Sequence, residues 1–166
     1  MRAVKGGPFD AVIVKGGVIV GEGGNRVFAT NDPTAHAEME AIRAATGSLG
    51  SFVLTGCDLS ASAQSCPMCL GAIYWARLDR VFYANSVKGA AVIGFDDEVL
   101  CRQLTCSSQQ RDIPKVPVLA EEAECVFPEY EAGSCTMRYW PTLLESAAYV
   151  GVVVRCFLVV AGDGPP

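Results

Sequence analysis

Two short motifs limit how this 166-residue chain can fold. Residues 36–38 read His-Ala-Glu and hold the single histidine, and residues 66–69 read Cys-Pro-Met-Cys, at a separation that fits one helix and one strand. Each motif lies where a helix is expected to begin, because residues 32–34 carry helix-start signals and Pro67 suits a first helical position. We therefore expect one imidazole, two thiols and one carboxylate to meet at two helix N-termini.

The rest of the pattern alternates strand and helix signals. β-Branched runs at residues 10–14 and 18–20 flank a glycine turn, which predicts a hairpin. Apolar residues at steps of three and four predict a helix that ends at Gly47 and holds His36 in its first turn. The other predicted elements are a strand from Phe52 towards Ser60, a helix over 67–77, a strand over 81–84, a helix over 97–104, a short strand over 116–119 and a helix over 121–131 that is interrupted or kinked at Pro128. This alternation predicts an α/β protein with three layers, an α/β/α sandwich.

The two motifs supply the donor set of a catalytic zinc site. His36, Cys66 and Cys69 would be the three protein ligands, and water, with its pKa lowered to about 7, would take the fourth position. The partial positive charge of a helix N-terminus stabilises thiolates at neutral pH. Zinc deaminases combine such ligands with a glutamate that carries protons without binding metal. Glu38 fits that role, because it can pass a proton from the water to a ring nitrogen and then to the leaving amine.

A Cys-x-x-Cys pair on its own is more often structural, redox-active or accidental. A closed structural zinc site would need a fourth cysteine, and Cys57 is the nearest spare one. The only histidine of the chain lies in a three-residue pattern that requires one, which favours the catalytic interpretation. The closed structural site stays as the alternative.

Composition narrows the class of substrate and the compartment. The net charge of -5 offers no positive field for a nucleic acid, so we expect a small substrate. With no signal peptide at the start, the eight cysteines are expected to be reduced in a cytoplasmic protein. Residues 147–161 are apolar but contain Arg155 and fall short of the roughly 20 residues that span a membrane. The composition changes after Tyr139, which indicates a catalytic domain over 1–139 and a C-terminal extension of unknown role over 140–166.

Four segments give the chain a resemblance to the guanine deaminase family of the cytidine deaminase superfamily. They are Gly-Gly-Pro-Phe at 6–9, Asp-Pro-Thr-Ala-His-Ala-Glu at 32–38, Cys-Pro-Met-Cys-Leu-Gly-Ala-Ile-Tyr-Trp-Ala-Arg at 66–77 and Ile-Gly-Phe-Asp-Asp at 93–97. The resemblance runs from Gly6 to about Tyr139. It implies a cytidine deaminase-like fold, one Zn²⁺ per chain, hydrolysis of guanine to xanthine and ammonia, and a homodimer with a swapped C-terminal segment.

The resemblance also implies roles for polar residues outside the metal ligands. Asp97 resembles a second acid that assists Glu38 at the departing amine, and its alternative role is a helix cap beside Asp96. Asn25 resembles the family's asparagine whose side-chain amide reads the purine edge, since an amide offers both a donor and an acceptor. Its alternative role is that of a turn residue.

Four further residues are implied in substrate binding. Phe9 matches an aromatic residue that packs on the purine, with core filling as the alternative. Trp75 matches an aromatic residue that lines the pocket, and core packing is its alternative. Ala37, between the metal ligand and the proton carrier, is also assigned to the substrate site. Tyr139 is the candidate for the aromatic residue that a neighbouring subunit places over the active site.

The chain departs from the family pattern in three places. Family members usually carry a helix before Gly6, where this sequence has only residues 1–5, so we expect a sheet face that needs a partner or destabilises the protein. Residues 64–65 are Gln-Ser where the family has Glu-Pro, so the loop before Cys66 lacks a stiffening proline. The segment after Tyr139 has no counterpart in the family, and our hypothesis is that it is dispensable.

Three other functions stay open. A guanosine deaminase would share the zinc machinery and differ in the room left for ribose. A tRNA adenosine deaminase would need a basic surface, which the acidic composition does not favour. An inactive deaminase-like binding or assembly subunit is favoured by the missing helix, whereas the carboxylates of Glu38 and Asp97 argue against it.

Overall fold

The computed structural model of the protein describes residues 6–95 and 97–133. The chain divides into two compact units, Met1–Cys101 and Arg102–Pro166. In the part of the chain that is described, no helix is long and apolar enough to cross a membrane.

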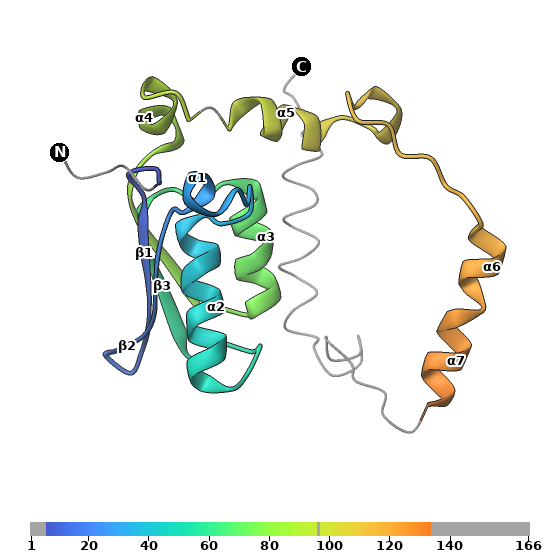
Figure 1. The fold of residues 1–166 in the computed structure, drawn as a ribbon, viewed down its shortest axis with the longest axis horizontal. Coiled ribbons are helices and arrows are strands. Elements are labelled where there is room, and N and C mark those ends of the chain that lie inside the picture. The colour runs from blue at the N-terminus through green and yellow to red at the C-terminus, as the bar shows by residue number, and fades with distance from the viewer. Residues whose placement is uncertain (1–5, 96, 134–166) are drawn as a thin grey trace, which may run out of the picture. The chain divides into compact units, whose positions relative to one another are not determined.

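The first unit is built on a four-stranded sheet in the order β2-β1-β3-β4 (Figure 1). Strands β1 (Asp10–Lys15) and β2 (Val18–Gly24) form an antiparallel hairpin, as predicted. Its turn holds Gly16 and Gly17 at φ 55° and 83°, the positive values that two-residue hairpin turns require. Strand β3 (Cys57–Ala63) pairs antiparallel with β1, and β4 (Arg80–Asn85) pairs parallel with β3.

Helix α2 (Ala37–Leu49) begins one residue after His36, which is its N-cap in extended conformation. The prediction that His36 lies in the first turn is therefore wrong by one position. The helix also runs past the predicted end, because Gly47 keeps helical geometry and Gly50, at φ 61°, forms the left-handed C-cap. Glycine is tolerated inside a helix at modest cost, so its presence alone did not locate the end.

Helix α3 (Pro67–Ala76) begins as predicted, with Cys66 as the N-cap and Arg77 as the C-cap. The prediction that the next strand starts at Phe52 is wrong, because β3 begins only at Cys57. The Leu54 amide donates to the Ala76 carbonyl at 2.7 Å, and Gly56 turns the chain at φ 81° before the strand. Contacts with the end of α3 thus override the strand propensity of this apolar segment.

Two short helices of the first unit escaped prediction, α1 (Val27–Thr30) and α4 (Val87–Val92). Elements of four and six residues are too short to display a helical period. The predicted strand over 81–84 is confirmed as the interior of β4, and the predicted helix over 97–104 is confirmed as α5 (Glu98–Thr105), shifted by one residue.

The described residues of the second unit contain a 3₁₀ turn at Ser108–Gln110 and two helices, α6 (Ala120–Glu124) and α7 (Val126–Ala132). The strand predicted over 116–119 is wrong, since this segment forms no ladder there. Pro117 offers no amide donor to a ladder. The helix predicted over 121–131 is interrupted, as expected, but at Cys125. Pro128 lacks a donor for the carbonyl four residues before it, so the break precedes the proline.

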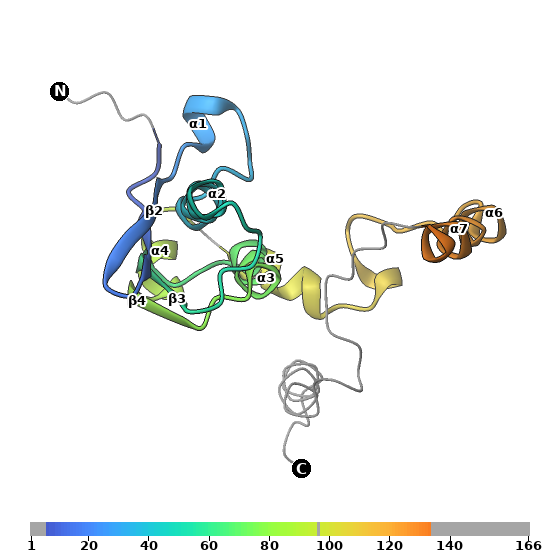
Figure 2. The ribbon, with the colours of Figure 1, turned by 90° about the horizontal axis from the view of Figure 1, so that it is seen from below.

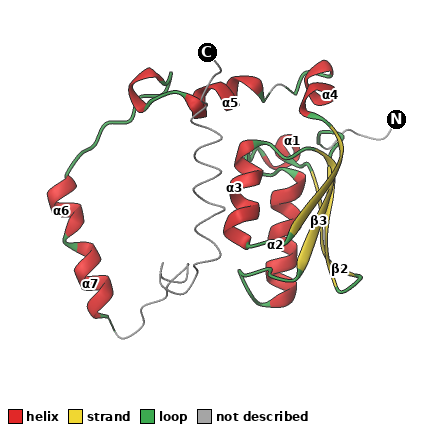
Figure 3. Ribbon diagram, turned by 180° about the vertical axis from the view of Figure 1, so that it is seen from behind, coloured by secondary structure: helices red, strands yellow, loops and turns green. Residues whose placement is uncertain are grey.

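Helices α2 and α3 lie side by side on one face of the sheet, as Figure 2 and Figure 3 show from two directions. The core between these layers is apolar. Its fully buried side chains include Ile13, Leu54 and Leu59. On the opposite face, Ile19 and Phe82 keep about half of their surface exposed.

Helix α2 approaches β2 closely because the strand presents glycine to it. A Cβ atom at Gly21 would lie 2.5 Å from the Ala41 carbonyl oxygen, and one at Gly23 would overlap the backbone of Ala37 and Ala41. These two glycines set the distance between helix and strand. The start of α2, which carries His36 and Glu38, is positioned by this contact.

Gly23→Ala is therefore expected to destabilise the protein by about 1–3 kcal/mol, the usual cost of overpacking. Gly47→Ala is the matched control, because its Cβ position within α2 has open space around it. The control should gain up to about 1 kcal/mol from helix propensity. Urea denaturation of both variants and the parent measures the two changes. Equal stability of Gly23→Ala and the parent would contradict the close packing.

Candidate metal centre and active site

The first metal-ligand candidate, His36, lies at the end of a loop that its own polar groups hold in place. The backbone amide and the hydroxyl of Thr34 donate to Asp32 Oδ1 at 2.8 and 2.7 Å. The His36 amide donates to the Thr34 carbonyl at 2.8 Å, and the His36 carbonyl accepts from Glu40 as α2 begins. The imidazole is thereby presented just before the helix.

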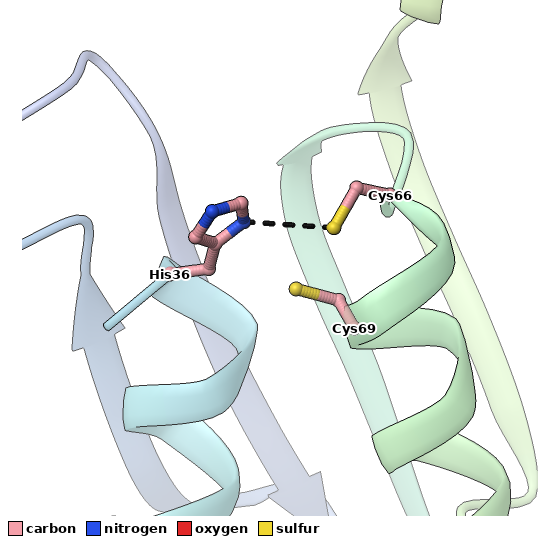
Figure 4. Close-up of side chains that lie close together, drawn as sticks. All are labelled: His36, Cys66 and Cys69. Atoms are coloured by element: carbon pink, nitrogen blue, oxygen red, sulfur yellow. Dashed lines mark hydrogen bonds between the residues drawn. The ribbon is translucent and has the colours of Figure 1, made fainter. Parts of the chain in front are cut away.

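The two cysteines come from the first turn of α3. Cys66 is the N-cap and Pro67 supplies the fixed φ of a first helical position, so the spacing of three places Cys69 on the same side. Figure 4 shows both sulfur atoms and the His36 ring gathered between the starts of α2 and α3. The three side chains meet because α2 and α3 lie on one face of the sheet and begin at the same edge.

The loop before Cys66 is held to the sheet although it lacks the family's proline. The Gln64 amide donates to the Asn85 carbonyl at 2.8 Å, which ties the end of β3 to the end of β4. The Gln64 side chain lines the cavity described below. Ser65 Oγ is buried and has no hydrogen-bond partner within the described residues.

The ligand atoms of His36, Cys66 and Cys69 all lie within 4.8 Å of one another, and Cys66 Sγ is 3.6 Å from His36 Nδ1. One nitrogen and two sulfur donors are a set that zinc favours, and three protein ligands leave a position open for chemistry. The residues therefore fit a single catalytic zinc ion.

Cys57 does not belong to this group, which within the described residues comprises His36, Cys66 and Cys69. It opens β3 at the far end from Ala63, and six strand residues extend about 20 Å. The closed structural site with Cys57 as a fourth ligand is thus excluded by the geometry.

Hydrogen bonds among the three candidate ligands shift their pKa values. A hydrogen bond from the Cys69 thiol, with another from His36, lowers the pKa of Cys66 to about 4. The same bond, together with burial, raises the pKa of Cys69, and the hydrogen bond to Cys66 raises the pKa of His36. Cys66 is therefore a thiolate at neutral pH, and a bound metal ion would displace the proton that Cys69 keeps.

The metal centre forms one end of a cavity of about 230 Å³ in the first unit. Its wall is mostly apolar, and acidic and amide side chains interrupt it. The lining residues are Phe9, Asp10, Asn25, Val27, Phe28, Pro33, His36, Ala37, Glu38, Ala61, Ser62, Ala63, Gln64, Cys66, Ala90, Phe95 and Asp97. A concave, mainly apolar site with a few polar groups is typical of small-molecule binding.

Both predicted acids face this cavity. Glu38 lies in the first turn of α2, is only 7% exposed, and lies close enough to Cys69 for its charge to help raise the pKa of that thiol. Asp97 lies close enough to His36 for its charge to raise the pKa of the imidazole. Its carbonyl also accepts from the Cys101 amide as α5 begins, so Asp97 is both a cavity residue and the start of a helix.

The cavity also contains three of the predicted substrate residues, Asn25, Phe9 and Ala37. Asn25 Oδ1 accepts from the amides of Gly7 and Val27, each at 3.3 Å, which leaves the NH₂ end to meet a ligand. The Phe9 ring meets Phe95 edge to face, with centroids 4.8 Å apart. The Asn25 side chain is thus held in one orientation by the backbone amides of Gly7 and Val27.

The structure does not bring Trp75 to the cavity of its own chain. It lies on the outer side of α3, with 59% of its surface exposed, while Cys69, Ile73 and Ala76 form the inward side. Core packing, the alternative for Trp75, is excluded by the same exposure. Tyr139 lies outside the described residues.

Sequence reasoning missed two aromatic residues of the cavity, Phe28 and Phe95. Phe28, 70% exposed, comes from the four-residue helix α1, whose existence was not predicted. Phe95 belongs to the 93–97 segment, but its place beside Phe9 depends on a contact between distant parts of the chain. The only signal for Phe95 was its proximity to Asp97.

Comparisons with known proteins agree with the geometry. Residues 1–85 match the family model of the cytidine and deoxycytidylate deaminase zinc-binding region. The guanine deaminase of Bacillus subtilis is 51% identical over 117 residues, which are 70% of this chain and 75% of that protein. A tRNA-specific adenosine deaminase of Agrobacterium fabrum is 44% identical over 86 residues, 51% of this chain and 57% of that one.

Solved structures show the same relationship. The crystal structure of the B. subtilis guanine deaminase superposes with a TM-score of 0.79 and 46% identity, over 82% of this chain and 87% of that chain. A guanine deaminase from Nitrosomonas europaea superposes with a TM-score of 0.54 and 32% identity, over 56% of this chain and 55% of that one. The mixed sheet with its helices therefore has the cytidine deaminase-like fold.

Replacement of one ligand should remove the metal. We expect the purified parent to hold about one zinc ion per chain, and Cys66→Ser to hold almost none, because three protein ligands define a catalytic site. Cys57→Ala is the matched control and should keep its zinc. Elemental analysis by plasma mass spectrometry measures all three proteins. Loss of zinc from the Cys57 variant alone would contradict the assignment.

Proposed function

Because the chain belongs to the guanine deaminase family, within the zinc-binding cytidine and deoxycytidylate deaminases, we propose that it hydrolyses guanine to xanthine and ammonia. The observation that carries this proposal is the cavity in which Glu38 lies beside the His36, Cys66 and Cys69 group. Zinc bound there supplies Lewis-acid activation of a water nucleophile.

Substrate binding depends on the cavity walls. The apolar surfaces of Phe9 and Phe95 suit the faces of a flat base, because stacked and edge-to-face arrangements of aromatic rings are favourable. The Asn25 NH₂ group would donate to a carbonyl oxygen or ring nitrogen of the purine, because its Oδ1 is engaged by the backbone. Ala37, small and buried, would leave room for the base against the start of α2.

Glu38 would carry the protons of the reaction. Its carboxylate takes one proton from the attacking water and gives it to the ring nitrogen beside the carbon that bears the amine. The second proton follows to the amine, the carbon–nitrogen bond breaks, and ammonia leaves as the carbonyl of xanthine forms. Burial beside the Cys69 thiol keeps this carboxylate at the end of the cavity where the chemistry takes place.

Asp97 would assist Glu38 at the departing amine. It lines the same cavity from the position just before α5, far along the sequence from Glu38 in α2. A second carboxylate can accept or return a proton as ammonia leaves, so Glu38 need not carry out every proton transfer.

We further propose a cytoplasmic homodimer of this chain, with residues 1–139 as its catalytic domain. Helix α3 is apolar on all sides, which is typical of a helix covered on all sides, yet Leu70 and Trp75 are exposed. A second copy with a swapped C-terminal segment would cover this surface and bring the partner's Tyr139 to the site. Light scattering of the purified protein should give the mass of two chains, and the mass of one chain would rule the dimer out.

The decisive test of the activity is ammonia release with guanine, guanosine, adenine, cytosine and cytidine side by side. We expect turnover of guanine by the zinc-loaded parent and at least a 100-fold loss of kcat in Glu38→Gln, which keeps the shape but not the base. Zinc content and melting temperature of the variant should equal those of the parent.

Two other results would change the proposal. Turnover of guanosine alone would keep the mechanism and replace the substrate. A zinc-loaded parent with no turnover of any of the five compounds would favour the inactive binding or assembly subunit.

Asn25→Asp tests how the purine is read. The aspartate keeps an oxygen for the amides of Gly7 and Val27, so the fold should persist with an unchanged melting temperature. It replaces the NH₂ donor by a second acceptor, which should lower kcat/KM for guanine at least tenfold, about the value of one hydrogen bond. Steady-state kinetics measures the change, and an unaltered kcat/KM would show that Asn25 does not donate to the substrate.

A further inference from the structure

A polar cluster on the outer side of α2 meets the loop that leads to His36. Arg43 donates to Glu40 Oε1 at 2.7 Å and, through its other terminal nitrogen, to Thr34 Oγ1 at 3.1 Å. Glu40 lies one turn after His36 and Arg43 two turns after it, and both are on the side of α2 away from the core. Neither the proposed chemistry nor the cavity uses Arg43.

Thr34 connects this cluster directly to the metal ligand. Its hydroxyl accepts from Arg43 and donates to Asp32, and its carbonyl accepts from the His36 amide at 2.8 Å. The guanidinium of Arg43 is therefore two hydrogen bonds and one residue away from the His36 backbone. A shift of Thr34 would move the imidazole with it.

The other end of the same loop is tied to the same cluster. The Arg26 amide donates to the Ala35 carbonyl at 2.9 Å, and the Arg26 side chain approaches Glu40 at 4.0 Å. The loop over residues 26–35 is thus closed at its base, with Asn25 just before it and His36 just after it. Glu40 and Arg43 hold both of its ends against α2.

His36 needs such support because its place at the helix end does little to fix its side chain. It is an N-cap residue in extended conformation, whose carbonyl accepts from the Glu40 amide, and its side chain makes no cap bond. Zinc requires the imidazole in one orientation relative to the two sulfur atoms. By contrast, a surface ion pair such as Arg43–Glu40 adds little to the stability of a fold.

We propose that Arg43 is a positioning residue of the metal centre, which acts through the Thr34 hydroxyl to hold the His36 backbone where the imidazole can bind zinc. The proposal rests on the zinc site and not on the identity of the substrate. It concerns the rate at which the metal is lost more than the stability of the fold.

The test compares zinc release from the full-length, zinc-loaded protein to an excess of a chromogenic chelator. Arg43→Ala and Thr34→Val, which removes the hydroxyl at nearly constant shape, should each release zinc about tenfold faster, as loss of an outer-shell contact does. Thr34→Ser keeps the hydroxyl and should release zinc at the parent's rate. The double variant Arg43→Ala/Thr34→Val should be no faster than Thr34→Val alone, because that variant has already broken the connection to Arg43.

Arg80→Ala is the matched control for loss of an exposed arginine. Arg80 pairs with Asp58 at 2.6 and 2.9 Å on the opposite side of the sheet from α2, so its removal should leave zinc release unchanged. The absorption spectrum of the cobalt-substituted protein gives a second readout, and only Arg43→Ala and Thr34→Val should alter it.

Three results would overturn the proposal. The first is zinc release at the parent's rate from Arg43→Ala, and the second is equal acceleration by Thr34→Ser and Thr34→Val. The third is equal acceleration by Arg43→Ala and Arg80→Ala, which would reduce the effect to general stability. None of these measurements needs a substrate, so a failure of guanine turnover would leave this test intact.

Discussion

The site depends on two helices that begin at the same edge of one sheet face. Helices α2 and α3 present His36 and Cys66 as neighbouring N-caps, and the first turns add Glu38 and Cys69. The partial positive charge of both helix ends favours thiolates and any anionic group nearby. Nitrogen, sulfur and carboxylate therefore meet without a long loop, and their relative positions are as rigid as the packing between the helices.

That packing is secured by contacts far from the metal centre. The glycines of β2 let α2 lie against the sheet, and the Leu54 amide anchors the end of α3 to the segment that enters β3. The Asp79 amide donates to the Cys57 carbonyl, which ties the entry of β4 to the start of β3. A small core of alanine and branched aliphatic residues is sufficient because the layers approach so closely.

The cavity combines a strongly polar end with mainly apolar walls. Cys66 is held as a thiolate and Glu38 is nearly buried, whereas Phe9 and Phe95 provide the flat surfaces. Low dielectric around the acid and the metal ligands strengthens each electrostatic interaction with a developing charge. A small neutral base suits such a site better than a polyanion does, in agreement with the net negative charge of the chain.

Local patterns in the sequence were enough to predict the His36, Cys66 and Cys69 group, the opening hairpin and the start of α3, because glycine turns, proline at a first helical position and metal-binding spacings act over a few residues. Three features depend on packing between distant segments: His36 is an N-cap, β3 begins at Cys57, and Phe28 and Phe95 line the cavity. The tertiary structure also turned Trp75 outward on α3. These outcomes arise from contacts between segments distant in sequence, whose energies no local pattern records.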